Sequence, residues 1–241
     1  MKINYSVSNL RRLVSTPQVE IRPITILLGR NSVGKSTFLR SFPLLRQSVE
    51  TKSSAPILWY GDYVDFGEFR GAVTNNDEDK SVRFSFNFEH FSTTVHSSDY
   101  IAVGGNIRAN TRSLRFDDVG ITYSVRSSAG LTGRDTITLT IPSLQLELSI
   151  GFADSRNFVR SLLLNGEELK PTFSDIEIYF SQGNIFANAA FFRIGKESKL
   201  VGEPKQSVFL RAIQKELDRY VDGRISRTTI ASEGVKNITK E

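Results

Sequence analysis

The stretch that decides how this chain is interpreted is Gly29-Arg30-Asn31-Ser32-Val33-Gly34-Lys35-Ser36-Thr37. It fits G-x-x-x-x-G-K-[ST], the phosphate-binding P-loop. Before it, the apolar run 24–28 is rich in β-branched residues and predicts a buried strand; after it, apolar residues at helical spacing predict a helix. Strand, glycine loop and helix is the order of elements that this motif requires.

The residue types in the loop suit a phosphate ligand. A Cβ at Gly29 or Gly34 would obstruct the approach of phosphate oxygens to backbone N–H groups. The following helix would direct its unsatisfied N–H groups and its positive dipole end at the same phosphates. Lys35 would act as the catalytic cation at the β- and γ-phosphates, and the Ser36 hydroxyl would ligate Mg²⁺. We therefore expect ATP or GTP and Mg²⁺ as cofactors, bound by residues 29–37; a glycine-rich turn that binds nothing is the alternative.

Composition narrows the class of protein. The chain has 241 residues, of which 39% are hydrophobic and 24% charged, as in ordinary globular proteins. No apolar run is long enough for a membrane span and the first residues do not resemble a signal peptide, so we expect no membrane partner and a cytoplasmic location. The absence of cysteine and the presence of only two histidines exclude a disulfide framework and leave little room for histidine catalysis. The net charge of +5 indicates a solvated basic surface or, alternatively, a nucleic-acid footprint.

Hydrophobic patterning divides the chain into three parts. Residues 1–80 form a nucleotide-binding front, with two or three strands before residue 29 and a helix from 35 to about 49 that Pro43 should kink or split. Residues 81–200 alternate as antiparallel strands do, with a hairpin expected at Asn165-Gly166. Residues 201–241 hold an amphipathic helix at 205–221 and a polar tail.

Two features near the predicted helix carry alternative interpretations. The stretch 57–69 is dense in aromatic, glycine and acidic residues, and it predicts either a strand with aromatic packing on a turn or a loop in which Asp62 or Asp65 orders Mg²⁺ or water. Gln47 is expected to be an ordinary surface or packing residue.

Residues 29–40 resemble the P-loop of ABC-type ATPase heads, in which an asparagine stands at the place of Asn31. That group includes chromosome-structure and recombination ATPases, overcoming-lysogenization-defect nucleases and "AAA family" ATPases of bacterial phage-defence systems. Residues 60–69 are similar to a G-x-x-V-D-x-G-x-F stretch in the defence-type members. The resemblance implies an α/β fold, namely a P-loop NTPase of ABC-ATPase head type with a large antiparallel β-subdomain. It also implies a head-to-head homodimer closed by ATP and a nucleic-acid-directed activity, with a partner effector such as a nuclease, in anti-phage defence.

The sequence departs from that family at the elements that hydrolyse ATP. The family has an apolar strand ending in Asp-Glu, but the nearest candidate, 162–168, places an Asn-Gly turn before its two acids and should be a hairpin. An LSGG-type signature and a histidine switch near the C-terminus are also missing. We favour the interpretation that the chain is the N-terminal portion of a longer ATPase, incomplete at the C-terminus. The alternative is a non-hydrolysing, ATP-dependent sensor or scaffold that docks partner proteins.

Nucleic-acid binding is a further hypothesis from the sequence. It rests on five arginines in a loop-rich region, which otherwise supply solvated loop charge: Arg108, Arg112, Arg115, Arg126 and Arg134. A GTPase is disfavoured because no Asn-Lys-x-Asp motif for reading guanine is present.

Overall fold

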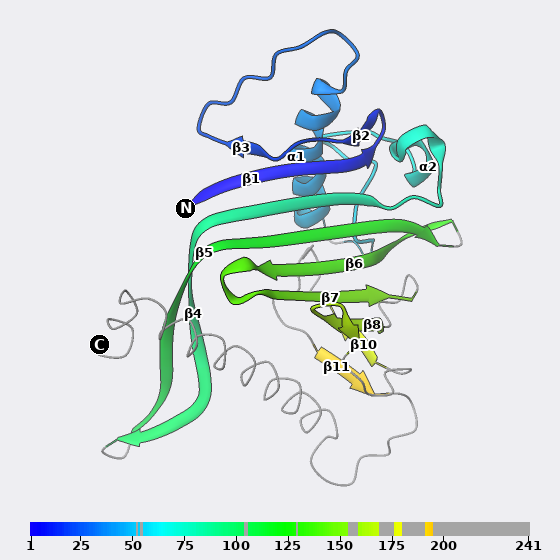
Figure 1. Cartoon of the computed structure of the whole chain (residues 1–241). Coiled ribbons are helices and arrows are strands. Elements are labelled where there is room, and N and C mark those ends of the chain that lie inside the picture. Colours follow the sequence, from blue (N-terminus) through cyan, green and yellow to red (C-terminus); the bar gives the residue numbers. More distant parts are fainter. Residues whose placement is uncertain are drawn as a thin grey trace.

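A computed structural model describes residues 1–51, 53, 55–103, 106–128, 130–153, 159–168, 176–179 and 191–194. One antiparallel sheet dominates these residues, in the strand order β2-β1-β4-β5-β6-β7-β8-β9, with β3 also paired to β1 (Figure 1). Its strands are β1 (Lys2–Leu10), β2 (Leu13–Ser15), β3 (Val19–Ile21), β4 (Val82–Val103), β5 (Asn106–Ser128), β6 (Leu131–Ile141), β7 (Leu146–Phe152), β8 (Val159–Leu164) and β9 (Glu167–Glu168). Strands β10 (Ile176–Tyr179) and β11 (Phe191–Ile194) form a separate pair.

Helices are few in the described residues. They are α1 (Lys35–Glu50), the single turn α2 (Phe69–Ala72) and the 3₁₀ turns η1 (Thr74–Asn76) and η2 (Pro142–Leu144). Helix α1 begins where the sequence predicts, and it continues through Pro43 as one element. The helix predicted at 205–221 lies outside the described residues.

The predicted α/β fold class is wrong. Every strand pair in the described part of the chain is antiparallel, and helices do not alternate with strands as a P-loop NTPase sheet requires. The run 24–28, expected to be the central buried strand, pairs with no other strand. Its side chains Ile24, Ile26 and Leu28 are 81%, 75% and 88% exposed, and only Leu27 packs partly against the core.

Helix α1 packs on one face of the sheet, behind β1 in the view of Figure 1. Tyr5 of β1 is fully buried and its ring contacts Phe38 and Phe42 of α1 at centroid distances of 5.4 and 4.8 Å. Its hydroxyl donates a hydrogen bond of 2.8 Å to Ser41 Oγ. Burial of these aromatic surfaces, together with one satisfied polar contact, therefore fixes α1 to the sheet.

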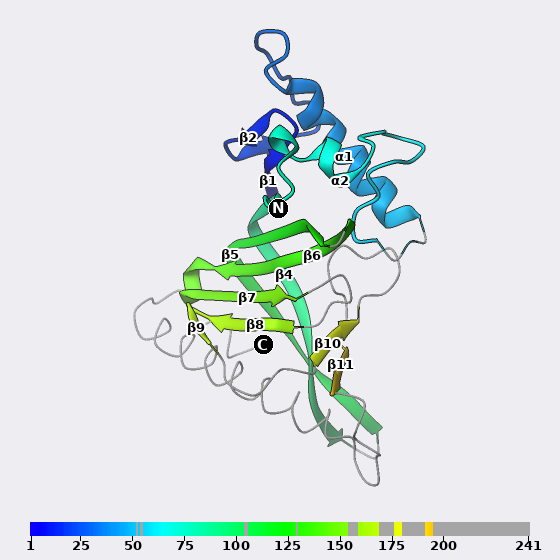
Figure 2. The ribbon, with the colours of Figure 1, turned by 90° about the vertical axis from the view of Figure 1, so that its right-hand side faces the viewer.

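Local patterning explains the strands that were predicted correctly. Val82, Phe84 and Phe86 alternate along β4, and the first two are fully buried in the core cluster that also contains residues of β1 and α1. Asn165 and Gly166 adopt φ of 53° and 81° between β8 and β9, which confirms the predicted two-residue hairpin. Beyond residue 91, β4 pairs only with β5, and the two strands leave the sheet as a long ribbon (Figures 1 and 2).

Candidate nucleotide-binding site

The P-loop residues form an exposed turn between the unpaired run 24–28 and helix α1. Residues 29–32 are all exposed, and Ser32 has φ of 64° while Gly34 has φ of 103°. An ideal Cβ at Gly34 would collide with the Leu13 side chain of β2. Glycine is therefore required at the last loop position, both for its backbone conformation and for the close packing of β2.

Lys35 folds back over this turn. Its Nζ donates hydrogen bonds to the carbonyl oxygens of Gly29 and Arg30, at 2.7 and 2.6 Å. The ammonium group thus sits against the loop backbone, with one of its three protons left for another acceptor. This geometry concentrates positive charge where the motif predicts the phosphates of a nucleotide.

The N-terminal end of α1 is open in a way that favours an anion. Gly34 is the N-cap residue, so no side chain caps the first turn, and the first turn contains no acidic residue. The helix has 16 residues, and its first free N–H groups belong to Lys35, Ser36 and Thr37, since the N–H of Phe38 bonds to Gly34 O at 2.9 Å. These N–H groups and the helix dipole form a ready anion site.

The fit of Mg²⁺ depends on Ser36. Its side chain is exposed at the second helical position and forms no hydrogen bond with the described residues, so its hydroxyl oxygen is available as a ligand. Among the described residues, no group of three or more His, Asp or Glu could hold a metal ion by itself. Mg²⁺ at this site would therefore be held mainly by nucleotide phosphates and water, with Ser36 as one protein ligand.

Asp62 and Asp65 are not assembled as a metal site. Their loop is attached to α1 through Gln47, which lies about three turns along the helix from Lys35. Asp65 Oδ1 accepts a hydrogen bond of 2.7 Å from the backbone N–H of Gly67, as in a local turn. Trp59, Val64, Phe66 and Phe69 are buried from the same stretch, so the packing interpretation fits best.

Gln47 has a role that the sequence did not reveal. Its side-chain amide donates to the carbonyl oxygens of Leu58 and Val64, and its Oε1 accepts from the backbone N–H groups of Tyr63 and Val64. A neutral polar residue on the buried stripe of a predicted helix was the only available signal. Gln47 therefore attaches the backbone of the loop 58–64 to helix α1, the helix that begins with Lys35.

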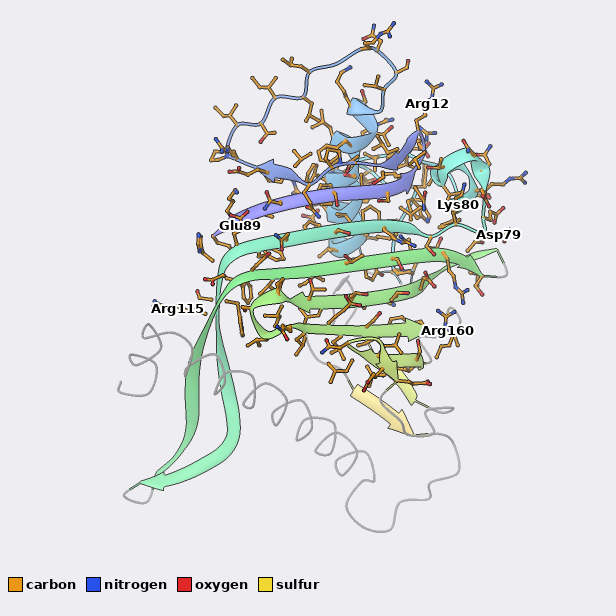
Figure 3. The ribbon with its side chains drawn as sticks, viewed as in Figure 1. Arg12, Asp79, Lys80, Glu89, Arg115 and Arg160 are labelled. Carbon is orange, nitrogen blue, oxygen red and sulfur yellow. The ribbon has the colours of Figure 1, made fainter. Side chains whose placement is uncertain are left out.

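The arginines expected to bind nucleic acid are not gathered into one surface. Arg134 is buried, with 6% exposure, and burial lowers its pKa. Arg126 lies 3.6 Å from Asp135 and donates to Ala153 O, whereas Arg115 is exposed farther along the sheet (Figure 3). The side chains of Arg108 and Arg112 lie outside the described residues.

Comparison with known proteins adds no identification to this geometry. The sequence matches no protein-family model and no curated protein sequence. In the part of the chain that the structure describes, no helix is both long enough and apolar enough to cross a membrane. The candidate site therefore rests on the motif and on the contacts described above.

Proposed function

We propose that this protein binds ATP, as its Mg²⁺ complex, at residues 29–37. The observation that carries the proposal is the uncapped N-terminus of α1, which follows the glycine loop and has Lys35 folded across that loop. The backbone N–H groups of the first turn would receive phosphate oxygens, and Lys35 would exchange its bonds to Gly29 and Arg30 for bonds to the phosphates. Ser36 would ligate Mg²⁺.

The substitution Lys35→Ala tests this proposal. Loss of a charge-assisted contact worth about 1.5–3 kcal/mol should weaken ATP binding roughly ten- to a hundredfold in calorimetric titrations with Mg²⁺. Lys80→Ala is a matched control, because Lys80 is a surface lysine that pairs with Asp77 at 3.1 Å (Figure 3). Unchanged ATP affinity in Lys35→Ala, or an equal loss in Lys80→Ala, would reject the assignment.

A second candidate function is an ATP-dependent sensor or scaffold that does not hydrolyse the nucleotide. The observation that favours it is the hairpin at residues 162–168, where Glu167 and Glu168 follow the turn and are exposed. In the described residues, this removes the nearest candidate for the carboxylate pair that positions Mg²⁺ and water during hydrolysis. Phosphate release measured at saturating ATP separates the two functions: turnover that disappears in Lys35→Ala excludes the sensor.

The biological setting belongs to the same proposal. We place the protein in the cytoplasm, where ATP-driven pairing of two copies would control a nucleic-acid-directed activity or a partner nuclease in defence against phage. The mass of the particle by light scattering, with and without Mg²⁺-ATP, tests the pairing. A mass that ATP leaves unchanged would contradict it.

A further inference from the structure

The tip of the β1–β2 hairpin consists of two consecutive arginines. Leu10 pairs with Leu13, so Arg11 and Arg12 alone form the turn. Two-residue hairpin turns favour asparagine and glycine because they need positive φ, and Arg11 has φ of 52°. A left-handed arginine costs about 1 kcal/mol or more. Two arginines thus occupy a turn in which asparagine and glycine are favoured, and they place two positive charges at its tip.

Arg11 is held in place rather than left free at the surface. Its backbone N–H donates to Ala72 O at 2.6 Å and its Nε donates to Gly71 O at 3.4 Å. Its guanidinium carbon lies 5.2 Å from the centroid of the Phe66 ring, which is a cation–π contact. These contacts hold the head group in place, and the exposed side chain has further N–H donors that these contacts do not use.

Two further arginines, Arg40 of α1 and Arg12 of the hairpin turn, lie near Arg11. The Arg40 guanidinium of α1 lies 5.9 Å from the same Phe66 ring, and Arg12 Nη1 reaches Ser32 O at 3.5 Å. Figure 3 shows Arg12 at the tip of the hairpin. Within the described residues, none of these three arginines forms an ion pair, whereas Arg22 and Arg46 pair with Glu20 and Glu50. We name Arg11, Arg12 and Arg40 the hairpin–helix arginine cluster.

The chemistry of the cluster suits phosphate groups, and two of its three arginines lie away from the nucleotide loop. Guanidinium heads match phosphate oxygens in a bidentate way, and stacking on an aromatic ring leaves their in-plane N–H groups available. Arg40 follows Lys35 by five residues, so its side chain leaves α1 about 140° around the helix from that of Lys35. Arg11 and Arg40 both approach Phe66, whereas Arg12 contacts the loop 29–34 through the Ser32 carbonyl oxygen.

We propose that the hairpin–helix arginine cluster binds the phosphate backbone of a nucleic acid. The chain carries a net charge of +5, and the three exposed arginines of the cluster form no ion pair with any residue that the structure describes. A backbone offers several phosphates in a row, which a set of separate guanidinium groups can contact together. The proposal does not depend on ATP binding at Lys35.

Fluorescence anisotropy with a labelled single-stranded DNA of about 20 nucleotides tests the proposal on the full chain without ATP. The test variant combines Arg11→Asn, Arg12→Gln and Arg40→Gln, in which asparagine tolerates the left-handed turn. Between about 50 and about 200 mM salt, the slope of log affinity against log salt should fall by about 2, with at least about tenfold weaker binding.

The control removes the same charge from ion-paired arginines, by combining Arg22→Gln, Arg46→Gln and Arg70→Gln. This control should bind DNA much as the unaltered protein does. Equal losses in both variants, or no change in the test variant, would overturn the proposal. So would a test variant that loses ATP binding while its affinity for DNA is unchanged, because the cluster would then serve the nucleotide. Lys35→Ala should bind DNA as the unaltered protein does. A failure of the ATP-binding proposal can therefore be distinguished from a failure of the nucleic-acid proposal.

Discussion

Replacing Gln47 with leucine removes the polar contacts that attach the loop 58–64 to helix α1 while keeping nearly the same side-chain volume. Gln47 is 2% exposed and uses both donors and both acceptor positions of its amide group. Two of these bonds, at 3.1 and 3.0 Å, satisfy the N–H and C=O groups of Val64, which is itself buried. Leucine would leave the Val64 N–H without this partner, whereas the Val64 C=O would keep the hydrogen bond that it accepts from Gly61 N–H at 3.1 Å.

The size of the effect follows from the Val64 N–H. A buried polar group without a partner costs about 1–3 kcal/mol, so Gln47→Leu should lower the free energy of unfolding by about 1–3 kcal/mol. The bonds to Leu58 and Tyr63 are only partly buried, and water can replace them at smaller cost. In a chain of this length, that loss lowers the melting temperature by roughly 2–12 °C.

Urea unfolding followed by tryptophan fluorescence measures this loss. Trp59 is the only tryptophan; it is buried and lies in the segment that Gln47 holds, so its emission reports on both the loop and the core. Val49→Ala is the control, because Val49 is 44% exposed on the same helix and should change stability by no more than about 0.5 kcal/mol. A Gln47→Leu protein that unfolds within about 0.5 kcal/mol of the unaltered chain would refute the reasoning.

Three further substitutions test single contacts. Gly34→Ala should destabilise the protein by about 1–3 kcal/mol more than Gly130→Ala, because both residues have positive φ but only Gly34 lacks space for a Cβ; equal melting temperatures would contradict this. Thr132→Val should cost about 0.5–1.5 kcal/mol and shift the emission of Trp59, whose Nε1 donates to Thr132 Oγ1 at 2.8 Å; an unchanged spectrum would contradict it. Burial raises the pKa of Tyr123 to about 12, and the charge of a neighbouring arginine only partly opposes this. The folded state thus holds the phenol proton more tightly than the unfolded state, so the free energy of unfolding should fall as the pH rises from about 10 to about 12. Urea midpoints measured across this range should fall less steeply in Tyr123→Phe.

Local signals account for what the sequence predicted correctly. The alternation of Val82, Phe84 and Phe86 and the Asn165-Gly166 turn each depend on a few neighbouring residues. Helix α1 was also predicted correctly, from Phe38, Leu39 and Phe42 at helical spacing, although Leu39 is 53% exposed. The P-loop motif predicted the position of Lys35 at the start of that helix.

The errors arose where burial depends on distant parts of the chain. The run 24–28 is apolar and β-branched, yet no neighbouring strand in the described residues covers it, so the buried strand predicted there was wrong. The α/β fold class that the resemblance implied was wrong because the described strands pair antiparallel. The contacts of Gln47 and Arg11 could not be predicted from the sequence either. Each depends on where the loop 58–72 returns to the helix and the hairpin, and no short-range pattern specifies that return.

The exposed run from Ile24 to Leu28 also affects how the protein behaves in concentrated solution. It is uncharged and apolar, and its backbone groups pair with no strand, as in segments that add edge to edge and aggregate. Arg22 and Pro23 precede it and Arg30 follows it, so charged and proline residues flank it in the manner of gatekeepers. Because salt screens the repulsion between copies of a chain that carries a net charge of +5, self-association should increase as the ionic strength rises.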